Sequence, residues 1–172
     1  MGELIFIIGG TRSGKSQQAQ KLAAAYGQKV GYLATCIPGD EEMAQRVLLH
    51  QKNRPSHWET IEAPREVVQV LRQDSAGFEA IVIDCLTLWI FNLMEIHRSE
   101  AEILTQVEQL CEVAKEAKAP ILLVSDEVGG GIVPDNALAR KFRDVTGGAN
   151  QIVARHAAAV YWMVAGIPVK IK

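Results

Sequence analysis

Eight residues near the start of the chain have the types and spacing to bind phosphate. The stretch GGTRSGKS satisfies the pattern G-x-x-x-x-G-K-[ST] between an apolar run and a helical pattern, which is the context that a phosphate-binding loop (P-loop) requires. Glycines let consecutive N–H groups point at one anion. Lys15 offers a charge to the outer phosphates, and Ser16 offers a hydroxyl to magnesium. We therefore expect the whole loop to bind nucleotide: Gly9, Gly10, Thr11, Arg12, Ser13, Gly14, Lys15 and Ser16.

Such a site also needs a carboxylate near the magnesium ion. Asp84 closes the apolar run AIVID, and Asp126 and Glu127 follow the run ILLVS. Each acid could instead cap the helix or turn that comes next. Because CLTLW predicts a helix immediately after Asp84, we favour Ser16 and Asp84 as the magnesium ligands. Glu127 stays a second candidate, ahead of a glycine-rich loop expected over the same edge.

A single histidine, His50, lies where it could act as a nucleophile. Met43, Val47 and His50 fall on one stripe of a predicted helix, and a stripe of that kind favours a packed, structural histidine. Lys52 and Arg54 follow closely and could neutralise phosphate charge. An unprotonated imidazole attacks phosphorus well, and its reference pKa of about 6.5 leaves it largely free at neutral pH. The spacing leaves both interpretations open.

The composition is that of an ordinary globular protein. The chain has 172 residues, 48% hydrophobic and 22% charged, so we expect one nucleotide-binding domain over residues 1–172. A formal net charge of -2 argues against a nucleic-acid partner. The N-terminal apolar run is too short for a signal peptide or a membrane span. Cys36, Cys85 and Cys111 have no disulfide or zinc spacing. We expect a cytoplasmic protein without stable membrane insertion.

Apolar runs alternate with helical patterns along the chain, which predicts an α/β fold with a mostly parallel central sheet flanked by helices. The runs do not alternate in polarity, as expected of strands covered on both faces. Strands are expected at 4–8, 30–35, 80–84, 121–125 and 160–165, with an edge strand at 169–172 and an edge strand or loop at 57–62. Helices are expected at 15–26, 41–51, 64–73, 99–118 and 136–158, and Ser99 with Glu102 predicts a capping box.

Taken together, these motifs closely resemble those of the bifunctional adenosylcobinamide kinase / adenosylcobinamide-phosphate guanylyltransferase family of cobalamin biosynthesis. The P-loop is shared with many nucleotide enzymes, whereas H-x-x-x-R-P and EVGGGIVP are far more specific. The likeness extends over essentially the whole chain, through GGTRSGKS, YLAT, HQKNRPSHW, ETIEAP, AIVIDCLTLW, VSDEVGGGIVPDNALARKFRDVTGGANQ and GIPVKIK.

The resemblance implies a RecA-like P-loop fold, a single catalytic domain and a homotrimer. It implies that His50 receives GMP from GTP as a covalent intermediate, and that Lys15 is also catalytic. It further assigns the guanine nucleotide site to Ala34, Thr35, Cys36, Gln51, Lys52, Asn53, Arg54, Glu62 and Asp84.

The implied chemistry consists of two reactions that use Mg²⁺. ATP or GTP first phosphorylates adenosylcobinamide, and GMP from GTP is then transferred to adenosylcobinamide phosphate, giving adenosylcobinamide-GDP and pyrophosphate. Asp84 could contact the metal or the ribose, and Glu62 could be an ordinary surface carboxylate. Two alternatives stay open: a P-loop kinase for a small metabolite without guanylyl transfer, and a P-loop ATPase or regulatory module.

Overall fold

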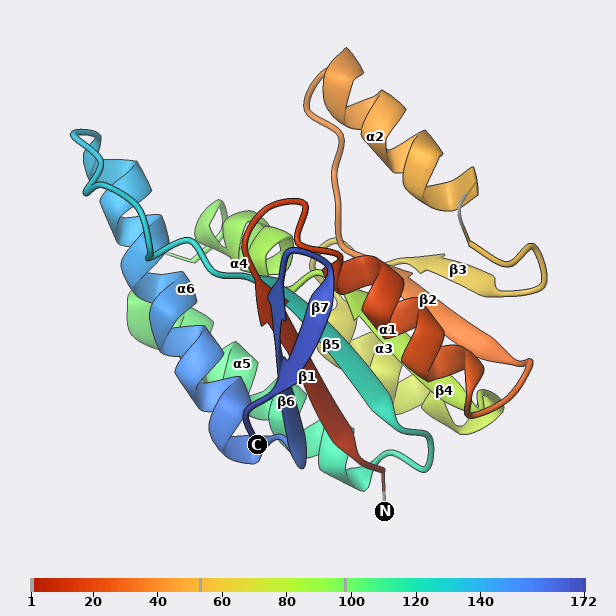
Figure 1. Cartoon of the computed structure of the whole chain (residues 1–172). Helices are drawn as coiled ribbons and strands as arrows, with labels where there is room; N and C mark the ends of the chain where they lie inside the picture. The colour runs from red at the N-terminus through yellow and green to blue at the C-terminus, as the bar shows by residue number, and fades with distance from the viewer. Residues whose placement is uncertain (1, 53, 98) are drawn as a thin grey trace.

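A seven-stranded sheet forms the centre of the protein (Figure 1). The computed structural model describes residues 2–52, 54–97 and 99–172. The strand order is β3-β2-β4-β5-β1-β6-β7. Neighbouring strands pair in parallel, except that β7 runs antiparallel to β6. The strands are β1 Leu4–Gly9, β2 Val30–Ala34, β3 Glu59–Glu62, β4 Ala80–Asp84, β5 Ile121–Asp126, β6 Ala159–Val164 and β7 Ile167–Lys170.

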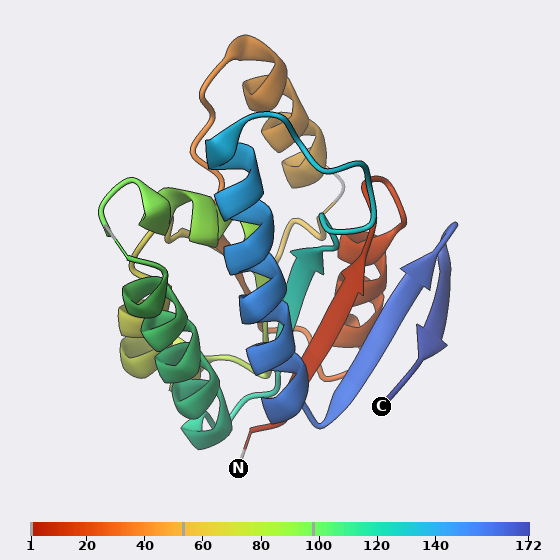
Figure 2. The ribbon, with the colours of Figure 1, turned by 90° about the vertical axis from the view of Figure 1, so that its left-hand side faces the viewer.

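Helices cover both faces of this sheet, so the predicted α/β architecture is confirmed. Helix α1 packs on one face, and α3, α4, α5 and α6 pack on the other (Figures 1 and 2). Helix α2 stands apart, beyond the edge where the parallel strands end (Figure 1). The helices are α1 Lys15–Ala24, α2 Glu41–Lys52, α3 Val67–Asp74, α4 Leu86–Met94, α5 Glu100–Glu116 and α6 Ala137–His156, with a short 3-10 turn at Ser75–Gly77.

Strand β1 shows why the apolar runs do not alternate in polarity. Leu4, Phe6 and Ile8 belong to the core under α3 to α6. Ile5 and Ile7 belong to the core under α1. Both sides of the strand are buried, and apolar burial is the main driving force for folding. Polar chemistry is therefore left to the ends of the strands.

The element boundaries follow the sequence expectations with small differences. Helix α3 begins at Val67 rather than at Pro64. The expected capping box is present, because Glu102 N donates to Ser99 Oγ at 3.3 Å and Ser99 N donates to Glu102 Oε2 at 3.1 Å. The uncertain segment 57–62 contains the short edge strand β3. Among the described residues, no helix is long and apolar enough to cross a membrane.

Helix α2 differs from expectation in its surroundings. Met43 and Val47 are only half-buried, and His50 is exposed. Leu48 and Leu49 are 56% and 59% exposed. Of the two interpretations that the spacing left open, the structure does not support the packed, structural histidine, because the stripe through Met43, Val47 and His50 does not enter the core. The stripe is exposed because α2 lies away from the sheet and the other helices and therefore has little to pack against (Figure 1).

Candidate functional site

The P-loop links the end of β1 to the start of α1, and two of its glycines are sterically required. Gly14 precedes α1 with a φ of 92°, in the left-handed region that favours glycine. A Cβ on Gly9 would lie 2.7 Å from the carbonyl oxygen of Met163 and 2.7 Å from Ser13 Oγ. The turn between β6 and β7 supports the loop, since Gly166 N donates to Ser13 O at 3.0 Å. Contacts within the chain thus hold the loop backbone in this shape.

Lys15 is buried in this loop and already has partners. Its side chain is 8% exposed, and its Nζ donates to Gly10 O at 2.6 Å. The same Nζ lies 2.6 Å from Asp126 Oδ1. Asp126 is opposite Gly9 in the pairing of β1 with β5. A buried ammonium needs a partner, and a phosphate of the nucleotide could replace Asp126 in this role.

Asp84, the favoured carboxylate, lies one strand further from the P-loop, at the end of β4. It is half-buried, and its Oδ2 accepts a hydrogen bond from the Tyr32 hydroxyl. Burial, together with the charge of Asp84, raises the pKa of Tyr32 well above its usual range, so Tyr32 keeps its proton and donates it. Lys15 contacts Asp126 and not Asp84. The sequence had left these two acids as rival candidates for the carboxylate near the magnesium ion.

Glu127, the second candidate, turns toward the glycine-rich loop. Its Oε1 accepts from Gly129 N at 2.6 Å, while its own N–H donates to Gly9 O at 3.0 Å. Its backbone is thus tied to β1 and its carboxylate caps the turn that follows. Glu127 shares the edge with the other two acids but acts here as a structural residue of the loop.

A buried polar chain that the sequence analysis missed supports the end of β5. Thr87 Oγ1 accepts from Asp126 N at 2.7 Å and lies 3.1 Å from Ser125 Oγ. Ser125 Oγ donates to Asn150 Oδ1 at 2.7 Å, and Asn150 Nδ2 donates to Asp126 O at 3.3 Å. These bonds hold the backbone of Asp126 from both sides. The available signal was polar residues within otherwise apolar strand and helix patterns.

Three of the proposed nucleotide residues meet on adjacent strands at this edge. Ala34 of β2 lies opposite Glu62 of β3 and opposite Asp84 of β4. Thr35 is fully buried, and its Oγ1 accepts from Cys85 N at 2.7 Å and donates to Cys85 O at 2.8 Å. Its side chain therefore ties β2 to β4 and is not free to bind nucleotide.

The described residues among 51–54, at the end of α2 and just after it, differ in their surroundings: Arg54 contacts the body of the protein, whereas the last residues of α2 face solvent. The Arg54 guanidinium lies 3.5 Å from the centre of the Tyr32 ring, and its NH1 donates to Thr60 Oγ1 at 3.2 Å. Gln51 and Lys52 are exposed on the last turn of α2. Asn53 lies outside the described residues.

His50 belongs to α2, and this helix stands beyond the strand ends and apart from the P-loop (Figure 1). The part of the chain that the structure describes thus brings Lys15, Ser16, Ala34, Glu62 and Asp84 to one edge and leaves His50 outside that cluster.

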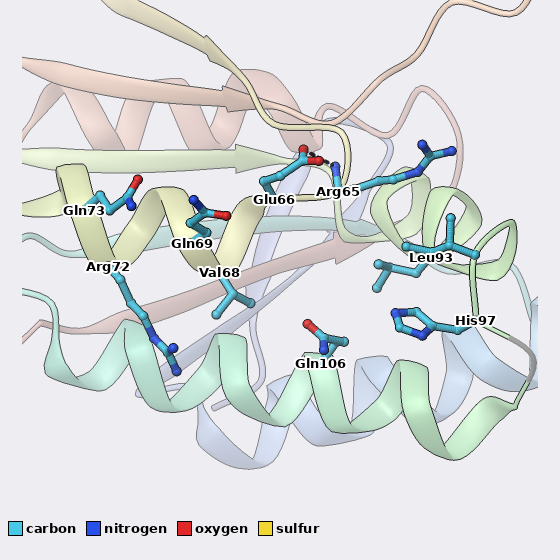
Figure 3. Close-up of a pocket in the computed structure, with 10 residues that line it drawn as sticks. Arg65, Glu66, Val68, Gln69, Arg72, Gln73, Leu93, His97 and Gln106 are labelled. Carbon is cyan, nitrogen blue, oxygen red and sulfur yellow. Dashed lines mark hydrogen bonds between the residues drawn. The ribbon is translucent and has the colours of Figure 1, made fainter.

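A cavity of about 540 Å³ lies elsewhere, among α3, α5 and the link between α4 and α5 (Figure 3). Arg72, His97 and Gln106 are among its lining residues. The described residues that line it include none of the proposed site residues. The candidate site is accordingly the open edge beside the P-loop and not this cavity.

Comparison with solved structures shows the fold of the chain. It is similar to the RadB recombinase, with a TM-score of 0.54 and 16% identity over 94% of this chain and 74% of that one. It is also similar to a KaiC-like protein from Pyrococcus horikoshii, with a TM-score of 0.56 and 15% identity over 94% of this chain and 72% of that one. The chain thus has the RecA-like α/β fold that the resemblance in sequence implied.

Comparison of sequences shows the family. A family model described as cobinamide kinase / cobinamide phosphate guanyltransferase matches residues 5–171. The bifunctional adenosylcobalamin biosynthesis protein CobP of Pseudomonas aeruginosa is 40% identical over 96% of this chain and 95% of its own length. The CobU proteins of Salmonella typhimurium and Escherichia coli are 38% and 36% identical, each over 98% of this chain and 99% of their own.

The chain therefore belongs to the cobinamide kinase / cobinamide phosphate guanyltransferase family. The full-length likeness to bifunctional biosynthetic proteins argues against a regulatory ATPase and against a kinase that lacks guanylyl transfer.

The cysteines at this edge lead to a prediction about pH. Burial first, and the charge of Asp84 second, raise the pKa of the half-buried Cys36 thiol. Cys85 is buried, and Cys111 lies away from this edge in α5, where burial raises its pKa to about 12. Only the thiolate is nucleophilic, so iodoacetamide at pH 8 should modify Cys36 more slowly than a cysteine in an unstructured peptide. Mass spectrometry after timed quenching measures the rate at Cys36.

The rate should rise with pH as the thiolate forms, and Asp84→Asn should increase it at pH 8 by removing the nearby charge. GTP should protect Cys36 if the proposed nucleotide site is correct. Alkylation as fast as that of the unstructured peptide, with no response to Asp84→Asn, would contradict this account of Cys36.

Proposed function

We propose that the chain phosphorylates adenosylcobinamide with ATP or GTP, and then transfers GMP from GTP to that phosphate through a covalent guanylyl-histidine at His50. The products of the second reaction are adenosylcobinamide-GDP and pyrophosphate. The observation that carries the proposal is the P-loop beside Asp126, with Asp84 one strand away at the same edge, in a chain that belongs over nearly its whole length to this family. Both activities are those that the family description names.

In the kinase reaction, the hydroxyl of the aminopropanol arm attacks the terminal phosphorus of the triphosphate. A new O–P bond forms, the bond to the bridging oxygen breaks, and the nucleoside diphosphate leaves. The N–H groups of residues 9–16 and the start of α1 bind the phosphates. Lys15 exchanges its bond with Asp126 for one with phosphate, which stabilises charge on the transferring group. Asp126 is then free to accept a hydrogen bond.

The residues present fit a magnesium ion that arrives with the triphosphate. Mg²⁺ usually binds through one or two protein oxygens, with phosphates and water completing its octahedron. Ser16 lies in the first turn of α1, and Asp84 has one oxygen beyond the Tyr32 hydrogen bond. Among the described residues there is no cluster of three or more His, Cys, Asp or Glu that could hold a metal alone. The ion would neutralise phosphate charge.

In the guanylyl transfer, an imidazole nitrogen of His50 attacks the α-phosphorus of GTP. An N–P bond forms and pyrophosphate leaves. A phosphate oxygen of adenosylcobinamide phosphate then attacks the same phosphorus, the N–P bond breaks, and His50 is regenerated. Splitting the transfer in two keeps the two polyanionic substrates from having to meet in one step. Gln51, Lys52, Asn53 and Arg54 follow His50 directly and would contact the nucleotide.

The exposed apolar surface of α2 supports the homotrimer as part of the proposal. Leu48 and Leu49 project from α2, and Ile132 and Val133, 96% and 68% exposed, project from the loop before α6. Apolar side chains left in water on this scale mark protein interfaces. A neighbouring subunit would cover them and would give α2, with His50, a surface to pack against. We also expect the protein to act in the cytoplasm.

The first prediction concerns His50. Wild-type protein incubated with GTP labelled in the α-phosphate should acquire a covalent label that is labile to acid and stable to alkali, as a phosphoramidate is. His50→Ala should abolish the label and leave phosphorylation of adenosylcobinamide at the wild-type level, because the kinase reaction does not use His50. His57→Ala is the matched control, since His57 is also exposed in this segment and should keep the label. Full labelling of the His50 variant would refute the assignment.

The second prediction concerns the P-loop. Lys15→Ala should lower kcat/KM for both reactions by at least about tenfold, because a hydrogen bond to a charged group contributes roughly 1.5–3 kcal/mol. Lys21→Ala is the control, because Lys21 is an exposed lysine of the same helix. Undiminished kinase activity in Lys15→Ala would remove the P-loop from its proposed role. Loss of the kinase reaction alone would place guanylyl transfer at another nucleotide site.

The third prediction concerns assembly. Light scattering should give a mass three times the 18.8 kDa of the chain. Leu49→Asp should dissociate the assembly if α2 forms the contact, and it should still fold, because Leu49 is exposed in the isolated chain. Ile167→Asp, at an exposed position of the edge strand β7, tests instead whether the contact between subunits is made through that strand. A monomeric wild-type protein would contradict the trimer.

A further inference from the structure

Tyr32 of β2 occupies the middle of a chain of contacts that joins two parts of the proposed site. Its side chain is 1% exposed. Its hydroxyl donates to Asp84 Oδ2, and the Arg54 guanidinium lies over its ring at 3.5 Å from the centroid. One residue thus touches the carboxylate at the end of β4 and the cation that follows the histidine helix. Sequence reasoning did not single out Tyr32, which looked like another apolar position in a buried strand.

The strand register explains why Tyr32 reaches Asp84. In the parallel pair of β2 and β4, Tyr32 lies opposite Val82, and Ala34 lies opposite Asp84. Residues two apart on a strand share a face, so Tyr32 and Asp84 are diagonal neighbours on the face that α1 covers. A phenol is long enough to span that diagonal. The ring belongs to the core that includes Val82 and Trp58, which restricts it to one orientation.

Arg54 depends on that ring for its position. Its Nε is buried and has no hydrogen-bond partner among the described residues. One of its terminal nitrogens reaches Thr60 Oγ1 at 3.2 Å. Stacking on an aromatic face stabilises a guanidinium most where water is excluded. The ring of Tyr32 therefore holds the cation that lies four residues after His50 in the sequence.

We propose that Tyr32 is a positioning residue for guanylyl transfer. Its hydroxyl engages Oδ2 of Asp84 and leaves Oδ1 to face the nucleotide, and its ring fixes Arg54 where that cation can meet the phosphates. The inference rests on the proposed function, because it gives Asp84 and Arg54 their nucleotide-binding roles. It adds a residue that touches neither substrate and that acts through Asp84 and Arg54.

The test separates the hydroxyl from the ring. Tyr32→Phe keeps the ring and its packing, so it should retain the fold and the Arg54 contact while releasing Asp84. The dissociation constant for GTP, measured by titration calorimetry, should rise severalfold, because Asp84 is then no longer held in the orientation that binds nucleotide. In an Asp84→Ala background the same substitution should leave GTP affinity unchanged, because the hydroxyl then has no carboxylate to position.

Tyr32→Leu removes the ring as well and should slow covalent labelling by GTP beyond the effect of Tyr32→Phe. Adding Arg54→Ala to Tyr32→Leu should cause little further loss, because Arg54 is already displaced. Tyr161→Phe is the control, since Tyr161 is another tyrosine packed against the same core, and it should behave as wild type. Should the Leu variant fail to fold, Tyr32→Phe and its double-mutant cycle still decide the question.

Wild-type GTP affinity and labelling in Tyr32→Phe would overturn the positioning role, as would effects of Tyr32→Phe and Asp84→Ala that simply add. A wild-type protein that neither binds GTP nor accepts the label would instead overturn the proposed function, so the two failures are distinguishable.

Discussion

Burial of both faces of the parallel sheet is the constraint on which the rest of this protein depends. Because α1 covers one face and α3 to α6 cover the other, the interiors of the central strands must be apolar on both sides. Charged groups can then lie only where the strands end. Parallel strands end at the same edge, so Gly9, Ala34, Asp84 and Asp126 come together although they are far apart in the sequence. The place of the candidate site at this edge is a direct consequence of how the core is buried.

The polar groups at that edge are held by other polar groups rather than left free. Lys15 is paired with Asp126, and the backbone of Asp126 is fixed by buried side chains of α4 and α6. Asp84 is held by Tyr32, while the Thr35 hydroxyl joins β2 to β4. Apart from Lys15, which would exchange Asp126 for a phosphate, these groups are preorganised, so little else has to be rearranged when charge develops on a phosphoryl group. The same bonds satisfy groups whose burial would otherwise be costly.

Helix α2 differs from the other helices because it does not pack on the sheet. Its amphipathic stripe has little to pack against within one chain, and its leucines remain in water. A helix of this length gains most of its stability from tertiary packing, so a surface from outside the single chain is the natural means of stabilising it. Because His50 lies on this helix, the proposed homotrimer would also position the nucleophile of the proposed reaction.

The sequence alone determined the local parts. The P-loop, the strands, the capping box of α5 and the family resemblance depend on short-range spacing, which the amino-acid pattern states directly. It also pointed to Asp84, Asp126 and Glu127 as acids at strand ends. Only the tertiary structure decided which acid meets Lys15, because that depends on strand order: β5, and not β4, lies next to β1.

Tertiary structure likewise decided that Thr35 is a structural tie and that Tyr32 contacts both Asp84 and Arg54. It also showed that the helical stripe of His50 is not core. Periodicity predicts which side chains share a face, but it does not say whether that face has a neighbour. Whether the face has a neighbour depends on where the connecting segments place the helix relative to the sheet.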